Sequence, residues 1–149
     1  MNLRLMLSNL IFISFLVSLF LTVNSVSVFK VSSCGTSTDL MLNVKPSVDP
    51  ILPVTDYKLY LDGDLSANVT GGRSEYTVTY NFIPLTPTTN DLCTEINASN
   101  ITCPLYVGSF ASESSGKIEQ GLSGTVTIKN QWFDENNQRI LCMLFKIQI

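Results

Sequence analysis

The four cysteines are the side chains of this 149-residue chain whose type and spacing most plainly indicate chemistry: Cys34, Cys93, Cys103 and Cys142. One close pair lies inside one distant pair, without the C-x-x-C spacing of a zinc site. The chain contains no histidine, which removes a common zinc ligand and the base of Ser-His-Asp and Cys-His nucleophiles. Four cysteines allow three pairings, and we favour Cys93–Cys103 with Cys34–Cys142. In the loop-entropy model these bridges stabilise the fold by roughly 3 and about 4–5 kcal/mol.

Carboxylate pairs are the remaining groups that could carry acid–base catalysis. Asp62 and Asp64 form such a pair, but they flank Gly63 in the pattern of a solvated turn. Gly71-Gly72 lacks the Lys-Ser/Thr that follows the glycines of a phosphate-binding loop. We therefore expect no enzymatic activity, no metal and no cofactor.

Residues 1–25 have the composition of a signal peptide. Arg4 precedes an almost wholly apolar run from Leu5 to Val23, and small residues then fit a cleavage site after Ser25. The alternative is an uncleaved signal anchor, because the run approaches the length of a membrane span. Cleavage leaves residues 26–149 as one domain in an oxidising compartment. The net charge is −3 and the sequence contains no basic patch, so a nucleic-acid partner is not expected.

Three N-glycosylation sequons agree with export. They begin at Asn68, Asn97 and Asn100, and all fall in predicted turns or loops. We therefore expect these asparagines to be accessible for modification.

Hydrophobic alternation predicts the elements that must position these groups. Residues that alternate with period two predict strands, whereas helical periodicity is almost absent. The predicted strands cover residues 26–31, 40–44, 57–61, 76–82, 125–129 and 143–149. A helical turn is expected around Cys93 at 90–96, a proline-punctuated connection at 46–53 and a polar loop at 112–124. This pattern predicts an all-β fold, an immunoglobulin-like antiparallel sandwich of two sheets.

The apolar positions of these strands are expected to face the space between the sheets. A packed core and a lipid cavity lined by the same residues have the same periodicity, so the pattern leaves both open. Trp132 and Phe133 could rim an opening, although such residues more often pack in a core or a hairpin. The candidate lining residues are Leu59, Leu61, Tyr76, Val78, Tyr80, Phe82, Leu105, Val107, Phe110, Val126, Ile128, Phe145 and Ile147.

The cysteine contexts resemble the ML lipid-recognition domains. The resembling segments are Cys34-Gly35, Tyr57–Gly63, Asp91-Leu92-Cys93, Asn100–Leu105 with Gly108, Gly124–Ile128 and Ile140–Phe145. Within the family the chain is most similar to phosphatidylglycerol/phosphatidylinositol transfer proteins, through Asp91-Leu92-Cys93 and Ile140-Leu141-Cys142, and to the Niemann–Pick lysosomal sterol carrier.

The resemblance implies a sandwich whose sheets are splayed to admit lipid. It implies a secreted or lysosomal protein that binds and transfers a sterol or a phospholipid in an apolar cavity. The alternative is a secreted recognition module that binds a receptor or a microbial lipid. We expect a monomer that contacts membranes at most transiently. Family members often carry a further disulfide between early strands, which this chain lacks, so the region around 46–53 is expected to be looser.

Overall fold

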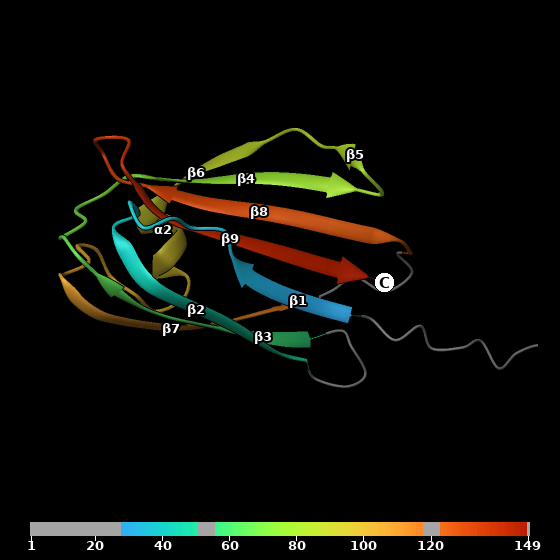
Figure 1. Cartoon of the computed structure of the whole chain (residues 1–149), viewed down its shortest axis with the longest axis horizontal. Coiled ribbons are helices and arrows are strands. Elements are labelled where there is room, and N and C mark those ends of the chain that lie inside the picture. The colour runs from blue at the N-terminus through green and yellow to red at the C-terminus, as the bar shows by residue number, and fades with distance from the viewer. Residues whose placement is uncertain (1–27, 51–55, 118–122, 149) are drawn as a thin grey trace, which may run out of the picture.

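The computed structural model describes residues 28–50, 56–117 and 123–148. These residues form two antiparallel sheets packed face to face, with one short helix beside them (Figure 1). The predicted two-sheet sandwich is therefore confirmed. The predicted signal peptide at 1–25 and Pro53 lie outside the described residues.

The larger sheet has the strand order β1-β9-β8-β4-β5, and β6 pairs with β4 beside β5. The smaller sheet has the order β2-β3-β7. The strands of the larger sheet are β1 (Val28–Ser33), β4 (Arg73–Tyr80), β5 (Ile83–Pro84), β6 (Thr88–Asp91), β8 (Thr125–Phe133) and β9 (Arg139–Gln148). Those of the smaller sheet are β2 (Met41–Pro50), β3 (Asp56–Leu65) and β7 (Gly108–Lys117).

The smaller sheet contains β7, a long strand that sequence patterning missed, as it also missed the short strands β5 and β6. The predicted loop over 112–124 is wrong for residues 112–117, which belong to β7 and pair with β3 along its whole length. The positions of β7 that face inwards here are Ser112, Ser114 and Gly116, all half-buried. Because these residues are small or polar, the strand lacks the apolar alternation by which the other strands are detected.

β3 is also longer than predicted. Residues 62–64 were expected to end the strand, but β3 continues to Leu65 because it is paired on both sides, with β2 and β7. Gly63 gives room for Met41, whose Cγ would lie 2.9 Å from a Cβ at that position. The predicted connection over 46–53 is wrong for residues 46–50, which continue β2 and pair with β3. Proline is tolerated in β2 because it is an edge strand.

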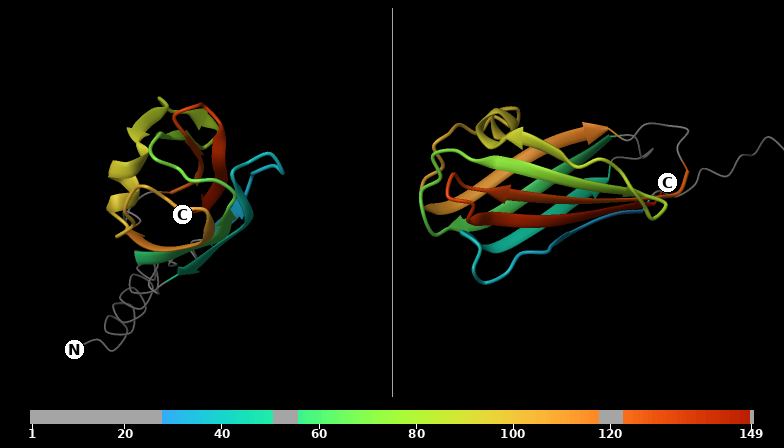
Figure 2. Two further views of the ribbon diagram at one scale, coloured as in Figure 1. Left: turned by 90° about the vertical axis from the view of Figure 1, so that its left-hand side faces the viewer. Right: turned by 90° about the horizontal axis from the view of Figure 1, so that it is seen from above.

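The helix α2 (Leu92–Asn97) confirms the helical turn expected around Cys93. Asp91 caps its N-terminus, and Leu92 and Ile96 point one turn apart into the core. The helix lies beside the sandwich, at the end of the molecule where β8 turns into β9 (Figure 2). Its buried face packs with Leu141 and Trp132 in the hydrophobic core.

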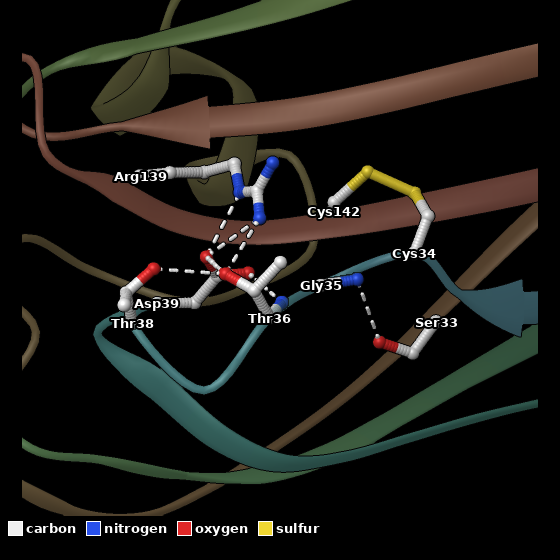
Figure 3. A network of polar contacts seen from close by, with 8 residues as sticks. All are labelled: Ser33, Cys34, Gly35, Thr36, Thr38, Asp39, Arg139 and Cys142. Carbon is white, nitrogen blue, oxygen red and sulfur yellow. Dashed lines mark hydrogen bonds and ion pairs between the residues drawn. A yellow bond between two sulfur atoms is a disulfide. The ribbon is translucent and has the colours of Figure 1, made fainter.

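Both predicted disulfides are present. Cys34–Cys142 joins the residue after β1 to β9, with a Cα–Cα distance of 4.9 Å. Cys93–Cys103 joins α2 to the segment before β7, with a Cα–Cα distance of 5.6 Å. Cys93 belongs to α2 itself, and Cys142 pairs with Gln131 of β8 (the bridge to Cys34 is drawn in Figure 3).

A polar network fixes the loop between β1 and β2 beside the first bridge (Figure 3). The Asp39 side chain is only 2% exposed and its Oδ1 lies 2.8 Å from Arg139 Nη2. Arg139 Nε and Thr36 Oγ1 also donate to this oxygen, at 2.9 and 3.0 Å. Gly35 is needed here, because a Cβ at that position would lie 2.6 Å from Asp39 Oδ2.

Candidate functional site: a cavity between the sheets

A cavity of about 330 Å³ lies between the two sheets, next to α2. Its volume is at the lower end of the range for ligand pockets, roughly 300–1,000 Å³. Both sheets and the α2 region contribute to its wall. The lining residues are Phe29, Tyr57, Leu59, Leu61, Tyr76, Glu95, Ile96, Ala98, Ser99, Ile101, Ser112, Ser114, Ile128, Asn130, Trp132, Met143, Phe145 and Ile147.

Strand register explains why the larger sheet presents these side chains. Ile128 is paired with Val78 on β4 and with Phe145 on β9, so the three share one face. Residues two apart along each strand lie on that same face. Tyr76, Asn130 and Met143 therefore follow next, towards the α2 end.

Aromatic rings close the wall away from α2. The Phe29 ring on β1 stacks on Tyr57 of β3, with centroids 4.7 Å apart, and so bridges the two sheets. Phe145 meets the Phe29 ring edge-on at 6.3 Å. The Tyr57 ring lies across Gly116, where a Cβ would be 2.3 Å from the tyrosine oxygen. Burial raises the pKa of the Tyr57 hydroxyl, so the ring stays neutral.

One part of the wall is polar. Glu95 extends from α2 towards β4, and its carboxylate accepts hydrogen bonds from the Tyr76 hydroxyl and, at 3.1 Å, from Ser74 Oγ. Ser74 Oγ also lies 3.1 Å from Asn130 Oδ1. Ser74 and Asn130 are 0% and 4% exposed. Burial, and then the hydrogen bond to Glu95, raise the pKa of Tyr76.

Trp132 contributes a hydrogen-bond donor that has no partner in the described part of the chain. The residue is 6% exposed, and no atom of the described residues accepts a hydrogen bond from Nε1. Phe110 packs edge-on against the ring, with centroids 6.4 Å apart. Trp132 is thus both part of the core, as expected, and part of the cavity wall.

The structure brings together about half of the residues predicted to line the cavity. Those placed on its wall are Leu59, Leu61, Tyr76, Ile128, Phe145 and Ile147. Val78, Tyr80 and Val126 lie on the same face of the sheet but beyond the cavity, and the Tyr80 hydroxyl donates to Ser123 O at 2.6 Å. Leu105 and Phe110 are buried in the core instead.

Two predicted lining residues do not face the space between the sheets. Phe82 is 92% exposed, because β4 ends at Tyr80 and the chain turns at Asn81 and Phe82 with positive φ. The alternation therefore stops before Phe82. Val107 is exposed as well; its backbone N–H donates to Asn68 Oδ1 at 2.8 Å and its side chain points to solvent.

Some lining residues were missed by the sequence analysis. Asn130 continues the period-two pattern of Val126 and Ile128, so extending that strand would have found it. Glu95 and Ser114 carry no such signal, because their place depends on how α2 and β7 pack.

The sequon residues Asn68, Asn97 and Asn100 are all exposed.

The part of the chain that the structure describes has no helix of the length and hydrophobicity needed to span a bilayer. Within the same residues, no group of three or more His, Cys, Asp or Glu side chains is placed to hold a metal ion.

The fold is an all-β sandwich of two antiparallel sheets with an apolar cavity between them. The ML domain family matches residues 28–149, and the chain belongs to that family. The putative phosphatidylglycerol/phosphatidylinositol transfer protein 1 of Dictyostelium discoideum is 20% identical over 146 residues, 95% of each chain.

Two solved structures share the fold. A Niemann-Pick type C2 protein from Japanese carpenter ant superposes with a TM-score of 0.58 at 15% identity, over 80% of this chain and 96% of that one. Chicken MD-1, crystallised with lipid IVa, gives a TM-score of 0.60 at 14% identity, over 82% of this chain and 89% of that one.

Proposed function

We propose that the protein binds a lipid in the cavity between its sheets and transfers it between membranes. The observation that carries this proposal is an apolar cavity inside an ML domain, walled by Leu59, Ile128 and Phe145. The relative named as a phospholipid transfer protein and the MD-1 complex with lipid IVa support it. The ligand is a sterol or a phospholipid.

Binding needs no covalent chemistry. An apolar chain that leaves water for the cavity gains roughly 0.8 kcal/mol per buried CH₂ group. The cavity of about 330 Å³ is small for a ligand pocket, so a larger lipid requires the sheets to move apart. The aromatic stack of Phe29 on Tyr57 is a non-covalent contact between the sheets that such a movement would open.

We place this activity outside the cytosol, in a secreted or endolysosomal setting. Two disulfides support an oxidising compartment, and the three exposed sequon asparagines support glycosylation during export. Digestion with a glycosidase and mapping of the mature N-terminus would test glycosylation and cleavage after Ser25.

Transient membrane contact fits the turn between β4 and β5. Phe82, Ile83 and Leu85 are exposed there, although apolar side chains normally avoid water. Lys30 and Lys146 oppose each other on the outer face of the larger sheet, and Lys129 is exposed on the same face. We propose that these lysines attract an anionic membrane while the turn inserts.

A pair of substitutions on one strand tests the cavity. Ser114→Phe places a ring inside the cavity, whereas Ser115→Phe places the same ring on the exposed face of β7. Fluorescent sterol and phospholipid binding should weaken only in Ser114→Phe, with both variants folded. If the delipidated protein binds neither lipid and native protein yields none on extraction, the proposed function is wrong.

The alternative is a recognition module, in which the apolar turn at Phe82 docks on a receptor protein. Transfer of a labelled lipid between vesicles by the purified protein, weakened by Phe82→Ser, favours the carrier. A stable protein complex without transfer activity favours the module.

A further inference from the structure

The polar part of the cavity wall is built around one carboxylate. Glu95 Oε1 accepts from the Ser74 and Tyr76 hydroxyls, and Oε2 accepts from Asn90 Nδ2 at 3.2 Å. These donors hold the carboxylate in place while Glu95 still lines the cavity. A pre-positioned acceptor of this kind can receive one more hydrogen bond, because each carboxylate oxygen has two lone pairs.

No cation balances this carboxylate among the described residues. The described lining residues include neither lysine nor arginine, and Glu95 is in none of the ion pairs found there. A phosphate, sulfate or carboxylate brought to Glu95 would meet a like charge in a partly desolvated site. The site therefore suits a neutral group that donates a hydrogen bond.

A second, independent observation points to a ligand group at the same wall. Trp132 Nε1 is buried with no acceptor among the described residues, and unpaired buried donors are rare in folded proteins. Trp132 is the direct cross-strand partner of Ser74, whose hydroxyl contacts Glu95. Opposed side chains on one face begin only about 5 Å apart, so the indole belongs to the same part of the wall.

We propose that this polar wall is a subsite for a neutral hydroxyl group of the lipid, which donates to Glu95 and accepts from the Trp132 indole. The inference rests on the proposed lipid-binding function and specifies its ligand chemistry. A sterol hydroxyl and the free hydroxyl of a diacylglycerol both fit this chemistry. Lipids that present an anion at the subsite are rejected by Glu95.

Matched ligands test the subsite in two arms. The sterol arm compares cholesterol with cholestenone, which accepts but cannot donate, and with cholesteryl sulfate, which is anionic. The diacyl arm compares diacylglycerol with phosphatidate. We expect the hydroxyl compound to bind at least about tenfold more tightly than its analogues, the effect of one charge-assisted hydrogen bond. The arm that shows this preference identifies the lipid class.

Variants show whether Glu95 and Trp132 cause the preference. Glu95→Gln keeps the shape of the side chain and can donate, so binding of the ketone and the anionic analogues should approach that of the hydroxyl compounds. Trp132→Phe should weaken all compounds that offer an acceptor, by about tenfold or less. Glu113→Gln, on the exposed face of β7, is the matched control and should keep the wild-type preference.

The outcomes separate this inference from the proposed function. If the wild-type protein binds neither the lipids of the two arms nor the fluorescent sterol and phospholipid of the cavity test, the carrier function itself fails. If lipids bind but the wild-type protein does not discriminate among them, or Glu95→Gln discriminates as the wild type does, the subsite is wrong and the carrier function stands.

Discussion

The ion pair between Arg139 and Asp39 joins residues 100 positions apart and is the most buried one among the described residues. Arg139→Met leaves the Asp39 carboxylate buried, with Thr36 as its remaining partner. Because an uncompensated buried charge is costly, we expect a stability loss of about 3 kcal/mol by urea unfolding. Lys58→Met removes an exposed ion pair with Glu113 and should change little. Equal losses in the two variants would contradict this account.

Gly116 is a position where one methyl group should change the cavity. Alanine there forces the Tyr57 ring away from Gly116, because a Cβ would lie 2.3 Å from the tyrosine oxygen. The stack of Tyr57 on Phe29, an arrangement worth about 0.5–1.5 kcal/mol, is then lost. We expect Gly116→Ala to speed lipid exchange in a protein that remains folded, as measured by stopped-flow release of a fluorescent lipid. Tyr57→Leu should do the same, and unchanged rates in both would show that the stack does not limit release.

At the scale of single elements, α2 depends on its N-terminal cap. Asp91 Oδ1 accepts from Thr94 N and Thr94 Oγ1, both at 2.8 Å. The backbone hydrogen bond from Thr94, followed by that from its hydroxyl, lowers the pKa of Asp91 from its ordinary 3.8. The cap therefore contributes fully above that ordinary value, and its contribution is lost as the pH falls through the lowered pKa.

Asp91→Ala should lower the melting temperature at neutral pH, because it removes this cap. The difference from wild type should shrink in acid, where the wild-type carboxyl is also protonated. Thermal unfolding of both proteins across this range measures the effect. A difference that does not depend on pH would mean that the cap does not act through its charge.

Sequence patterning predicted the elements whose own residues carry the signal. Residues 76–80 and 125–129 alternate, and they are strands whose even-numbered positions face inwards. β7 could not be found this way, because Ser112 and Ser114 face a cavity and need not be apolar. Glu95 likewise acquires its place from the packing of α2 against β4, a contact between residues about 20 positions apart. Phe82 was wrongly predicted to lie in the strand and face inwards, because alternation does not show that β4 ends at Tyr80.

At the scale of the whole molecule, the two disulfides should differ in their effect on stability. Replacing Cys34 and Cys142 by serine opens a loop of 108 residues, whereas Cys93 and Cys103 close one of 10. Loop entropy predicts losses of about 4–5 and roughly 3 kcal/mol, respectively. Denaturant unfolding and secreted yield of the two double variants should follow this order. The reverse order would show that local packing around each bridge outweighs loop closure.

Cys93–Cys103 links α2 to the segment before β7, whereas the Phe29–Tyr57 stack joins β1 to β3 away from α2. Cys34–Cys142 joins β1 to its neighbour β9 in the larger sheet, so neither bridge ties the two sheets together near Tyr57, and that part of the sandwich can open without breaking a bond. Backbone amides near Cys142 should exchange with deuterium slowly, and those near Tyr57 faster. The stability of the fold and the rate of lipid release then depend on different residues, so selection can change one without changing the other.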